Sequence, residues 1–200
     1  MASSSSNPSA PLPIGVLVSG TGSNLQVLLD ELHPDVVEVV GVASSRADAY
    51  ALERAAAAGI PTATFDIRDH ADRAARDAEM ATWMIGRGAA LIVCAGFMWL
   101  LTDAFRERFP GRVINLHPSL LPAFPGRHAM EDALAAGVRE TGVSIFVVDE
   151  GVDTGPVLAQ ERIPVEYDDR LATLRARIQA VEHRLLPETI RAIAEGRISL

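Results

Sequence analysis

The 200-residue chain contains no lysine, and all 18 of its basic residues are arginines. This absence excludes Schiff-base chemistry, attachment of pyridoxal phosphate and the phosphate-binding lysine of a Walker A loop. The 26 acidic residues give a formal net charge of −8, which argues against a broad nucleic-acid surface. One small anion site stays possible, because backbone N–H groups at the start of a helix bind anions without a cationic side chain.

Cysteine and long apolar runs are scarce as well. The one cysteine, Cys94, excludes an internal disulfide and a cysteine-based zinc site, and its apolar neighbours predict an inert, buried strand residue. No apolar run approaches the ~20 residues that cross a membrane. Residues 1–13 are rich in Ser and Pro and lack the pattern of a signal peptide. We therefore expect a disordered tail over residues 1–13 and a cytoplasmic protein without a membrane partner.

From Ile14 onward, short apolar runs alternate with longer amphipathic segments. The apolar runs suit strands at 14–18, 36–42, 62–65, 91–95, 113–116, 143–148 and 157–163. Helical spacing or helix-forming composition covers 25–32, 49–58, 69–87, 102–109, 129–136 and 168–195. Near-continuous apolar strands that alternate with helices predict one α/β domain over residues 14–200. We expect a Rossmann-like, mostly parallel twisted sheet flanked by helices.

A glycine-rich turn, Gly20-Thr21-Gly22-Ser23-Asn24, follows the first expected strand. Open α/β sheets bind ligands at this place, and the helix that begins here offers free N–H groups to an anion. A dinucleotide fingerprint requires glycine where Leu25 stands, so that motif fails. A tight turn that binds nothing is the other interpretation of this loop. Arg46, after the second expected strand, leaves an NADP-dependent oxidoreductase open, with a solvated loop as the simpler alternative.

Two polar side chains, Asn115 and His117, flank Leu116 at the end of an expected strand. Strand alternation places both on the same side, where an amide donor and an imidazole can stabilise a developing oxyanion. A histidine stacked in a proline-rich turn is the structural alternative.

The acidic turn that spans residues 149–156 brings a carboxylate that favours the imidazolium form of a nearby His117. A calcium loop is another possibility, but the turn lacks the ligand spacing of an EF-hand. A solvated hairpin is the third interpretation.

Four segments occur in a characteristic order: Gly20–Asn24, Ala95–Met98, Asn115–Pro122 and the pattern Asp149-x-x-x-Asp153-x-Gly-Pro. From Ile14 to the final helix, the chain resembles the phosphoribosylglycinamide formyltransferase family, folate-dependent enzymes of purine biosynthesis. The resemblance implies that the formyl group of 10-formyltetrahydrofolate, a cosubstrate, passes to the amine of glycinamide ribonucleotide. It implies direct attack, an oxyanion stabilised by Asn115 and His117, and no metal.

The resemblance also assigns roles to individual residues. The catalytic set is Asn115, His117 and Asp153. The phosphate and nucleotide set is Gly22, Ser23, Asn24, Gln179, Ala180, Val181 and Glu182. The folate set is Arg73, Met98, Trp99, Leu100, Leu101, Asn115, Asp149, Glu150, Gly151, Val152 and Asp153. Two positions depart from the family pattern, because Trp99 stands where arginine is common and Phe146 stands where some relatives carry histidine.

Other folate-dependent enzymes are the nearest alternatives. A formyltetrahydrofolate hydrolase and a methionyl-tRNA formyltransferase are each expected to carry a further domain, and the length of 200 residues and the charge of −8 favour the nucleotide enzyme. The oxidoreductase alternative gives no chemical role to Asn115, His117 and Asp153. We expect no nucleic-acid partner, and a homodimer stays open.

Overall fold

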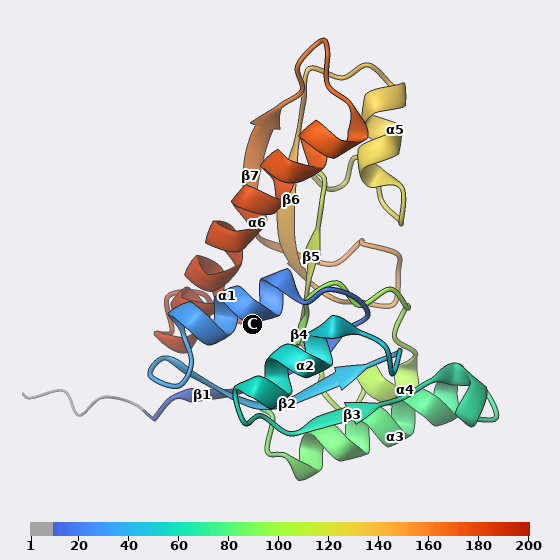
Figure 1. The fold of residues 1–200 in the computed structure, drawn as a ribbon, viewed down its shortest axis with the longest axis vertical. Coiled ribbons are helices and arrows are strands. Elements are labelled where there is room, and N and C mark those ends of the chain that lie inside the picture. The colour runs from blue at the N-terminus through green and yellow to red at the C-terminus, as the bar shows by residue number, and fades with distance from the viewer. Residues whose placement is uncertain (1–9) are drawn as a thin grey trace, which may run out of the picture.

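The computed structural model describes residues 10–200, which form one seven-stranded sheet with helices on both faces (Figure 1). The strands are β1 (Leu12–Val18), β2 (Val37–Ser44), β3 (Thr62–Thr64), β4 (Leu91–Cys94), β5 (Val113–His117), β6 (Glu140–Val147) and β7 (Val157–Pro164). The helices are α1 (Ser23–Glu31), α2 (Tyr50–Ala57), α3 (Arg73–Gly86), α4 (Asp103–Arg106), α5 (Ala129–Ala135) and α6 (Leu171–Ala194), and a short 3-10 turn covers Ile67–Asp69.

The strand order β3-β2-β1-β4-β5-β6-β7 confirms the mostly parallel sheet that the sequence predicts. Strands β1 to β5 run parallel to one another, whereas β6 and β7 are antiparallel to their neighbours. The order reverses beside β1, because β2 lies on one side of it and β4 on the other. Loops that follow β1 and β4 separate at such a point, which is where open α/β sheets bind their ligands.

Alternation along the strands divides the core into two clusters, one on each face of the sheet. Val16 of β1 packs with α1, α2 and α6, whereas its neighbour Leu17 packs with α3 and α4. Successive strand side chains point to opposite faces, so a strand that is apolar throughout needs helices on both sides. Helices α1, α2 and α6 therefore cover one face of the sheet, and α3 and α4 cover the other (Figure 1).

Some boundaries differ from the sequence-based prediction. The tail expected to extend to Pro13 ends earlier, because β1 begins at Leu12, whose N–H donates to the carbonyl oxygen of Val36 at 3.1 Å. Residues 1–9 of that expected tail lie outside the described residues. The helix expected from Asp69 begins only at Arg73, because the Asp72 carboxylate accepts from the N–H of Ala75 and caps it there.

The remaining elements deviate by a few residues. The helix expected over 102–109 is the single turn α4, and the terminal helix α6 begins at Leu171 rather than at residue 168. Within residues 10–200, no helix combines the length and apolar character that a membrane crossing requires.

Candidate active site

Strand β5 ends with Asn115 and His117 on one face of the sheet. Ile114 and Leu116 pack into the α1–α6 side of the core, whereas Val113 packs on the α3–α4 side. The alternation predicted from the sequence therefore places Asn115 and His117 together, at the carboxyl end of a central strand. Among residues 10–200, the side chain of Asn115 makes no hydrogen bond, so its amide is free to donate to a ligand.

The ring of His117 is buried and faces an oxygen atom at each nitrogen. Nε2 lies 2.8 Å from the carbonyl oxygen of Phe124, and Nδ1 lies 3.3 Å from Oδ2 of Asp153. A carbonyl oxygen can only accept, so Nε2 carries a proton, while Nδ1 lies at ion-pair distance from the carboxylate. Oδ2 of Asp153 also accepts from the N–H of Gly126 at 2.8 Å, which ties the turn after β6 to the loop after β5. The loop after β5 and the turn after β6 therefore both contact the histidine ring.

A buried polar network fixes the loop that supplies the Phe124 carbonyl. The Ser144 hydroxyl donates to the carbonyl oxygen of Ser119 at 2.6 Å and accepts from the N–H of Leu121 at 3.1 Å. Gln160 of β7 donates to the Ser144 hydroxyl at 2.8 Å and to the Leu121 carbonyl at 3.0 Å, and the Ser119 hydroxyl donates to Ala123 at 2.6 Å. Strands β6 and β7 therefore hold residues 119–123 of the proline-rich loop in place.

A small cavity lies beside Asn115, and we call it the apolar cavity. It holds about 40 Å³ and is lined by Cys94, Phe97, Trp99, Leu100, Leu101, Asn115, Phe146, Val148, Gly151 and Asp153. Of the residues assigned to folate by resemblance, six lie in this wall: Trp99, Leu100, Leu101, Asn115, Gly151 and Asp153. Burial raises the pKa of the Cys94 thiol to about 12, so this cysteine is an inert part of the wall.

The other residues assigned to folate lie outside this wall. Met98 is half-exposed, and its N–H donates to the Ser19 hydroxyl at 3.1 Å. The Asp149 carboxylate accepts from the N–H of Gly151 and from the Thr154 hydroxyl, so it stabilises its own turn. Glu150 and Val152 are exposed on the same turn, and Arg73 is exposed at the first residue of α3.

The glycine-rich turn encloses a second cavity of about 220 Å³, the glycine-loop cavity, lined by Gly20–Asn24, Ala95 and Gly96. Helix α1 begins here without a side-chain cap, so its first N–H groups are available to an anion. Gly22 has a φ of 72°, and a Cβ there would lie 2.6 Å from Cβ of Ala51. Only glycine fits, because the turn is left-handed and packs directly on α2.

Helix α6 contacts this turn through two of the residues that the sequence assigned to the nucleotide. Gln179 donates to the Ser23 hydroxyl at 2.9 Å, and Asn24 donates to the Glu182 carboxylate at 3.1 Å. Burial raises the pKa of Glu182, against the smaller opposing effect of the Asn24 hydrogen bond. Between them, Ala180 is exposed and Val181 packs partly on the core.

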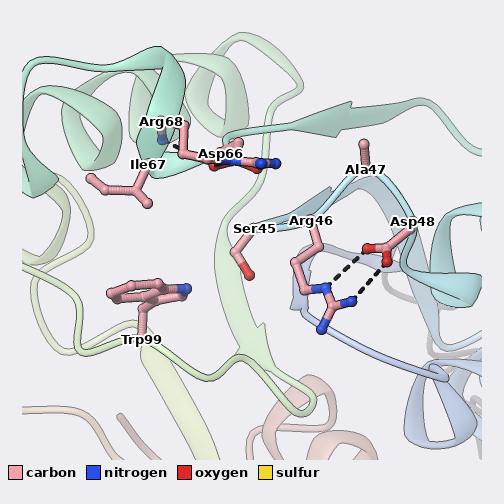
Figure 2. A pocket seen from close by; sticks show the side chains of 8 residues that line it. All are labelled: Ser45, Arg46, Ala47, Asp48, Asp66, Ile67, Arg68 and Trp99. Carbon is pink, nitrogen blue, oxygen red and sulfur yellow. Dashed lines mark hydrogen bonds and ion pairs between the residues drawn. The ribbon is translucent and has the colours of Figure 1, made fainter.

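A third hollow, about 560 Å³, opens at the ends of β2 and β3 and is lined by Ser45, Arg46, Ala47, Asp48, Asp66, Ile67, Arg68 and Trp99. We call it the arginine cavity. Figure 2 shows Arg46 held by two hydrogen bonds to Asp48, at 2.9 and 2.7 Å. Arg46 and Asp48 form an exposed ion pair, so a phosphate placed beside Arg46 would also meet the Asp48 carboxylate. The structure therefore gives the oxidoreductase alternative no support.

Sequence reasoning missed several residues that hold this site. Arg76 and Asp77 form a fully buried ion pair on α3, and Arg106 donates to the carbonyl oxygens of Leu101 and Asp149 at 3.3 and 2.9 Å. Arg127 donates to the carbonyl oxygen of Met98. Arg76, Asp77 and Arg106 lie in helices, where charged residues look like a solvated face, so nothing in their spacing marks these contacts. They become visible only when the loops after β4, β5 and β6 are placed together.

The chain is similar to proteins of known name. The sequence profile of the formyl transferase family matches residues 13–190. The phosphoribosylglycinamide formyltransferase of Mycobacterium tuberculosis (strain H37Rv) is 46% identical over 194 residues, which cover 96% of this chain and 90% of that protein. The trifunctional purine biosynthetic protein adenosine-3 of Chironomus tentans is 40% identical over 94% of this chain, which spans only 14% of that protein. Glycinamide ribonucleotide transformylase 1 of Symbiobacterium toebii superposes with a TM-score of 0.93 at 43% identity, covering 96% of this chain and 92% of that one.

Proposed function

The chain belongs to the formyl transferase family, and we propose that it transfers the formyl group of 10-formyltetrahydrofolate to the amine of glycinamide ribonucleotide. One observation carries the proposal: the free amide of Asn115 and the paired His117 and Asp153 meet at the end of β5. The adjacent end of β4 serves both ligand cavities, since Cys94 lines the apolar cavity and Ala95 lines the glycine-loop cavity. Two substrates can therefore meet beside the polar group.

The glycine-loop cavity is the place for the phosphate of the ribonucleotide. Gly22, Ser23 and Asn24 supply backbone N–H groups at the start of α1, where the helix dipole favours an anion. Gln179 and Glu182 reach the same turn from α6, so they are suited to bind the sugar hydroxyl groups. The site binds an anion without any lysine, which fits a chain whose basic residues are all arginine.

The apolar cavity is the place for the pterin ring of the folate. Phe97, Trp99 and Leu101 supply apolar contacts, and the backbone of the loops can meet the polar edge of the ring. A volume of about 40 Å³ is too small for a fused bicyclic ring, so folate binding has to widen it. Residues 150–152, which include the exposed Glu150 and Val152, are the part of this turn that we expect to move.

The chemical step is direct transfer. The neutral amine of the ribonucleotide attacks the formyl carbon, and the carbonyl electrons move onto oxygen to give a tetrahedral oxyanion. Asn115 and the imidazolium of His117 donate hydrogen bonds to that oxygen. When the intermediate collapses, the bond from carbon to the folate nitrogen breaks, and the proton lost by the amine passes to that nitrogen. The Asp153 carboxylate faces Nδ1 of the same ring at 3.3 Å.

His117 requires one change before it can act in this way. Its Nε2 atom now lies 2.8 Å from the Phe124 carbonyl oxygen, and the residue is 4% exposed. The oxyanion must replace that carbonyl as the acceptor, so the 124–126 loop has to shift when the substrates bind. Gly126, which binds Asp153 through its N–H, lies on the same loop and would move with it.

The test is a formyl-transfer assay with both substrates and the purified protein. We expect release of tetrahydrofolate together with formylation of the nucleotide, in equal amounts. A second reaction without the nucleotide distinguishes transfer from hydrolysis, since a hydrolase would release formate at an undiminished rate. Absence of turnover with both substrates present would contradict the proposal.

A further inference from the structure

Helix α3 contains an ion pair that is completely shielded from solvent. The side chains of Arg76 and Asp77 are both 0% exposed. Nε and Nη2 of Arg76 donate to Oδ1 of Asp77 at 2.9 and 2.6 Å. Burying two charges is costly, and replacing such a pair by apolar residues is often neutral or stabilising. A contribution to stability alone therefore does not explain why the pair is present.

The second carboxylate oxygen of Asp77 holds the end of the segment that lines the apolar cavity. Oδ2 accepts from the N–H of Thr102 at 2.7 Å and from its hydroxyl at 2.9 Å. The preceding residues, 97–101, form one wall of the apolar cavity through Phe97, Trp99, Leu100 and Leu101. One carboxylate thus joins the buried arginine to the backbone of the cavity wall, 25 residues further along the chain.

The guanidinium of Arg76 supports the same wall from beneath. Its Cζ atom lies 5.3 Å from the ring centroid of Trp99 and 5.8 Å from that of Phe97. Among the described residues, Nη1 of Arg76 has no hydrogen-bond partner. The guanidinium is therefore stabilised on this side by cation–π contacts with the two aromatic rings. Trp99 lines both the apolar cavity and the arginine cavity, into which its ring projects (Figure 2).

We propose that the buried Arg76–Asp77 pair positions the 97–102 segment for the folate cosubstrate, with the ring of Trp99 as its aromatic partner. The inference rests on the proposed function and concerns one of its two substrates. Arg76 and Asp77 are positioning residues, because they act through Thr102, Phe97 and Trp99. They set the affinity for folate and leave the phosphate site, which lies on α1, unchanged.

The pair also determines which side chain suits position 99. A guanidinium at this position would lie close to the fully buried charge of Arg76, which would repel it. An aromatic ring turns the same charge into an attraction. Trp99, which departs from the arginine common in the family, therefore matches the buried arginine beneath it.

The first experiment measures the steady-state kinetics of Asp77→Asn, Arg76→Lys and Thr102→Val. We expect the KM for 10-formyltetrahydrofolate to rise about tenfold, whereas kcat and the KM for glycinamide ribonucleotide change less than about twofold. Lysine keeps the charge of Arg76 but loses its planar fork and its stacking. Thr102→Val removes a single hydroxyl that donates to Asp77. The folate KM of this variant can therefore be measured even if the variants of the buried charges do not fold.

The matched control is Ile190→Ala, a buried apolar change on α6 in the other core cluster. It destabilises the fold, and we expect it to leave both KM values unchanged. If the three variants change the folate KM no more than this control does, the pair has no positioning role. If they raise both KM values and lower kcat together, the effect is general and the inference is wrong.

A double-mutant cycle of Trp99→Arg and Arg76→Gln tests the pairing itself. Glutamine can still donate a hydrogen bond to Asp77 but carries no charge. We expect Trp99→Arg to raise the folate KM at least about fivefold more in the presence of Arg76 than in the Arg76→Gln background. Additive effects would overturn the inference while transfer by the unsubstituted protein still stands. Absence of that transfer would instead overturn the proposed function.

Discussion

Oδ2 of Asp153 lies 3.3 Å from Nδ1 of His117, and the backbone of Asp153 holds it there at a φ of 55°. Phe124, whose carbonyl meets the other nitrogen of the same ring, has a φ of 53°. In residues 10–200, these two are the non-glycine residues with positive φ. Strained backbone of this kind persists where the surroundings enforce it, and it concentrates at functional sites. Here both strained residues hold one histidine.

Asn115→Ala should lower turnover without loosening the fold. The side chain makes no hydrogen bond inside the described protein, so its removal leaves no buried partner unsatisfied. Loss of one donor to an oxyanion typically lowers kcat by roughly 10²–10³. The measurement is kcat together with the melting temperature. A variant with near-normal kcat would remove Asn115 from the oxyanion site.

Gly22→Ala should damage both the fold and nucleotide binding, and Gly59→Ala is its matched control. The two glycines have φ values of 72° and 73°, but only at Gly22 does a Cβ meet other atoms, with Ala51 as near as 2.6 Å. Gly59→Ala should lower the free energy of unfolding by only about 1–2 kcal/mol, which is the strain of a left-handed backbone at alanine. Urea unfolding and the KM for glycinamide ribonucleotide distinguish the two variants, because only Gly22→Ala should change both quantities strongly. Equal effects of the two changes on both quantities would contradict the close packing of the turn on α2.

Glu182→Gln should change stability in a pH-dependent way. Burial raises the pKa of Glu182 above its ordinary value of 4.5, so the folded state holds this proton more tightly than the unfolded state. The stabilising contribution of the carboxyl group is complete below the unfolded pKa and disappears as the pH rises through the folded pKa. The variant should therefore match the original protein near pH 4 and be more stable near neutral pH, at about pH 7.

Melting temperatures across that range test this prediction. If glutamine at position 182 gives no advantage at neutral pH, the carboxylate is not destabilised by burial. The same variant should raise the KM for the ribonucleotide, because Glu182 is one of the groups assigned to it.

Cys94 should resist thiol reagents in the native protein. Its pKa of about 12 leaves almost no thiolate at ordinary pH. We expect no reaction with Ellman's reagent until the protein is unfolded, and one thiol per chain afterwards. Fast labelling of the native protein would show that the apolar cavity opens widely in the absence of ligand.

The sequence sufficed for the features that depend on local pattern. Alternation along β5 predicts that Asn115 and His117 share a face. A glycine loop before α1 predicts a ligand site at the carboxyl ends of the strands. Such features depend on the pleat of a strand and on the start of a helix, which are properties of neighbouring residues.

Contacts between distant loops could not be predicted in the same way. The carbonyl oxygen of Phe124 accepts from His117 because the backbone of Phe124 is left-handed. Nothing in the side chain of a phenylalanine predicts that conformation. Arg76 and Asp77 read as part of a solvated helix face, and only the packing of α3 beneath the loop after β4 shows that they are buried. Tertiary packing fixes the polar residues that support the candidate site, and local alternation predicts only the shared face of Asn115 and His117. The assignment of Asp153 rests on the resemblance to the family.

In the proposed reaction, the His117–Asp153 pair drives formyl transfer from folate to the ribonucleotide amine. The most direct measurement is kcat for that reaction in the unsubstituted protein, in His117→Ala and in Asp153→Asn, with nucleotide binding measured in parallel. We predict steady transfer by the unsubstituted protein and kcat lower by roughly 10²–10³ or more in both variants, with nucleotide affinity retained. Transfer at nearly the original rate in both variants would contradict the account.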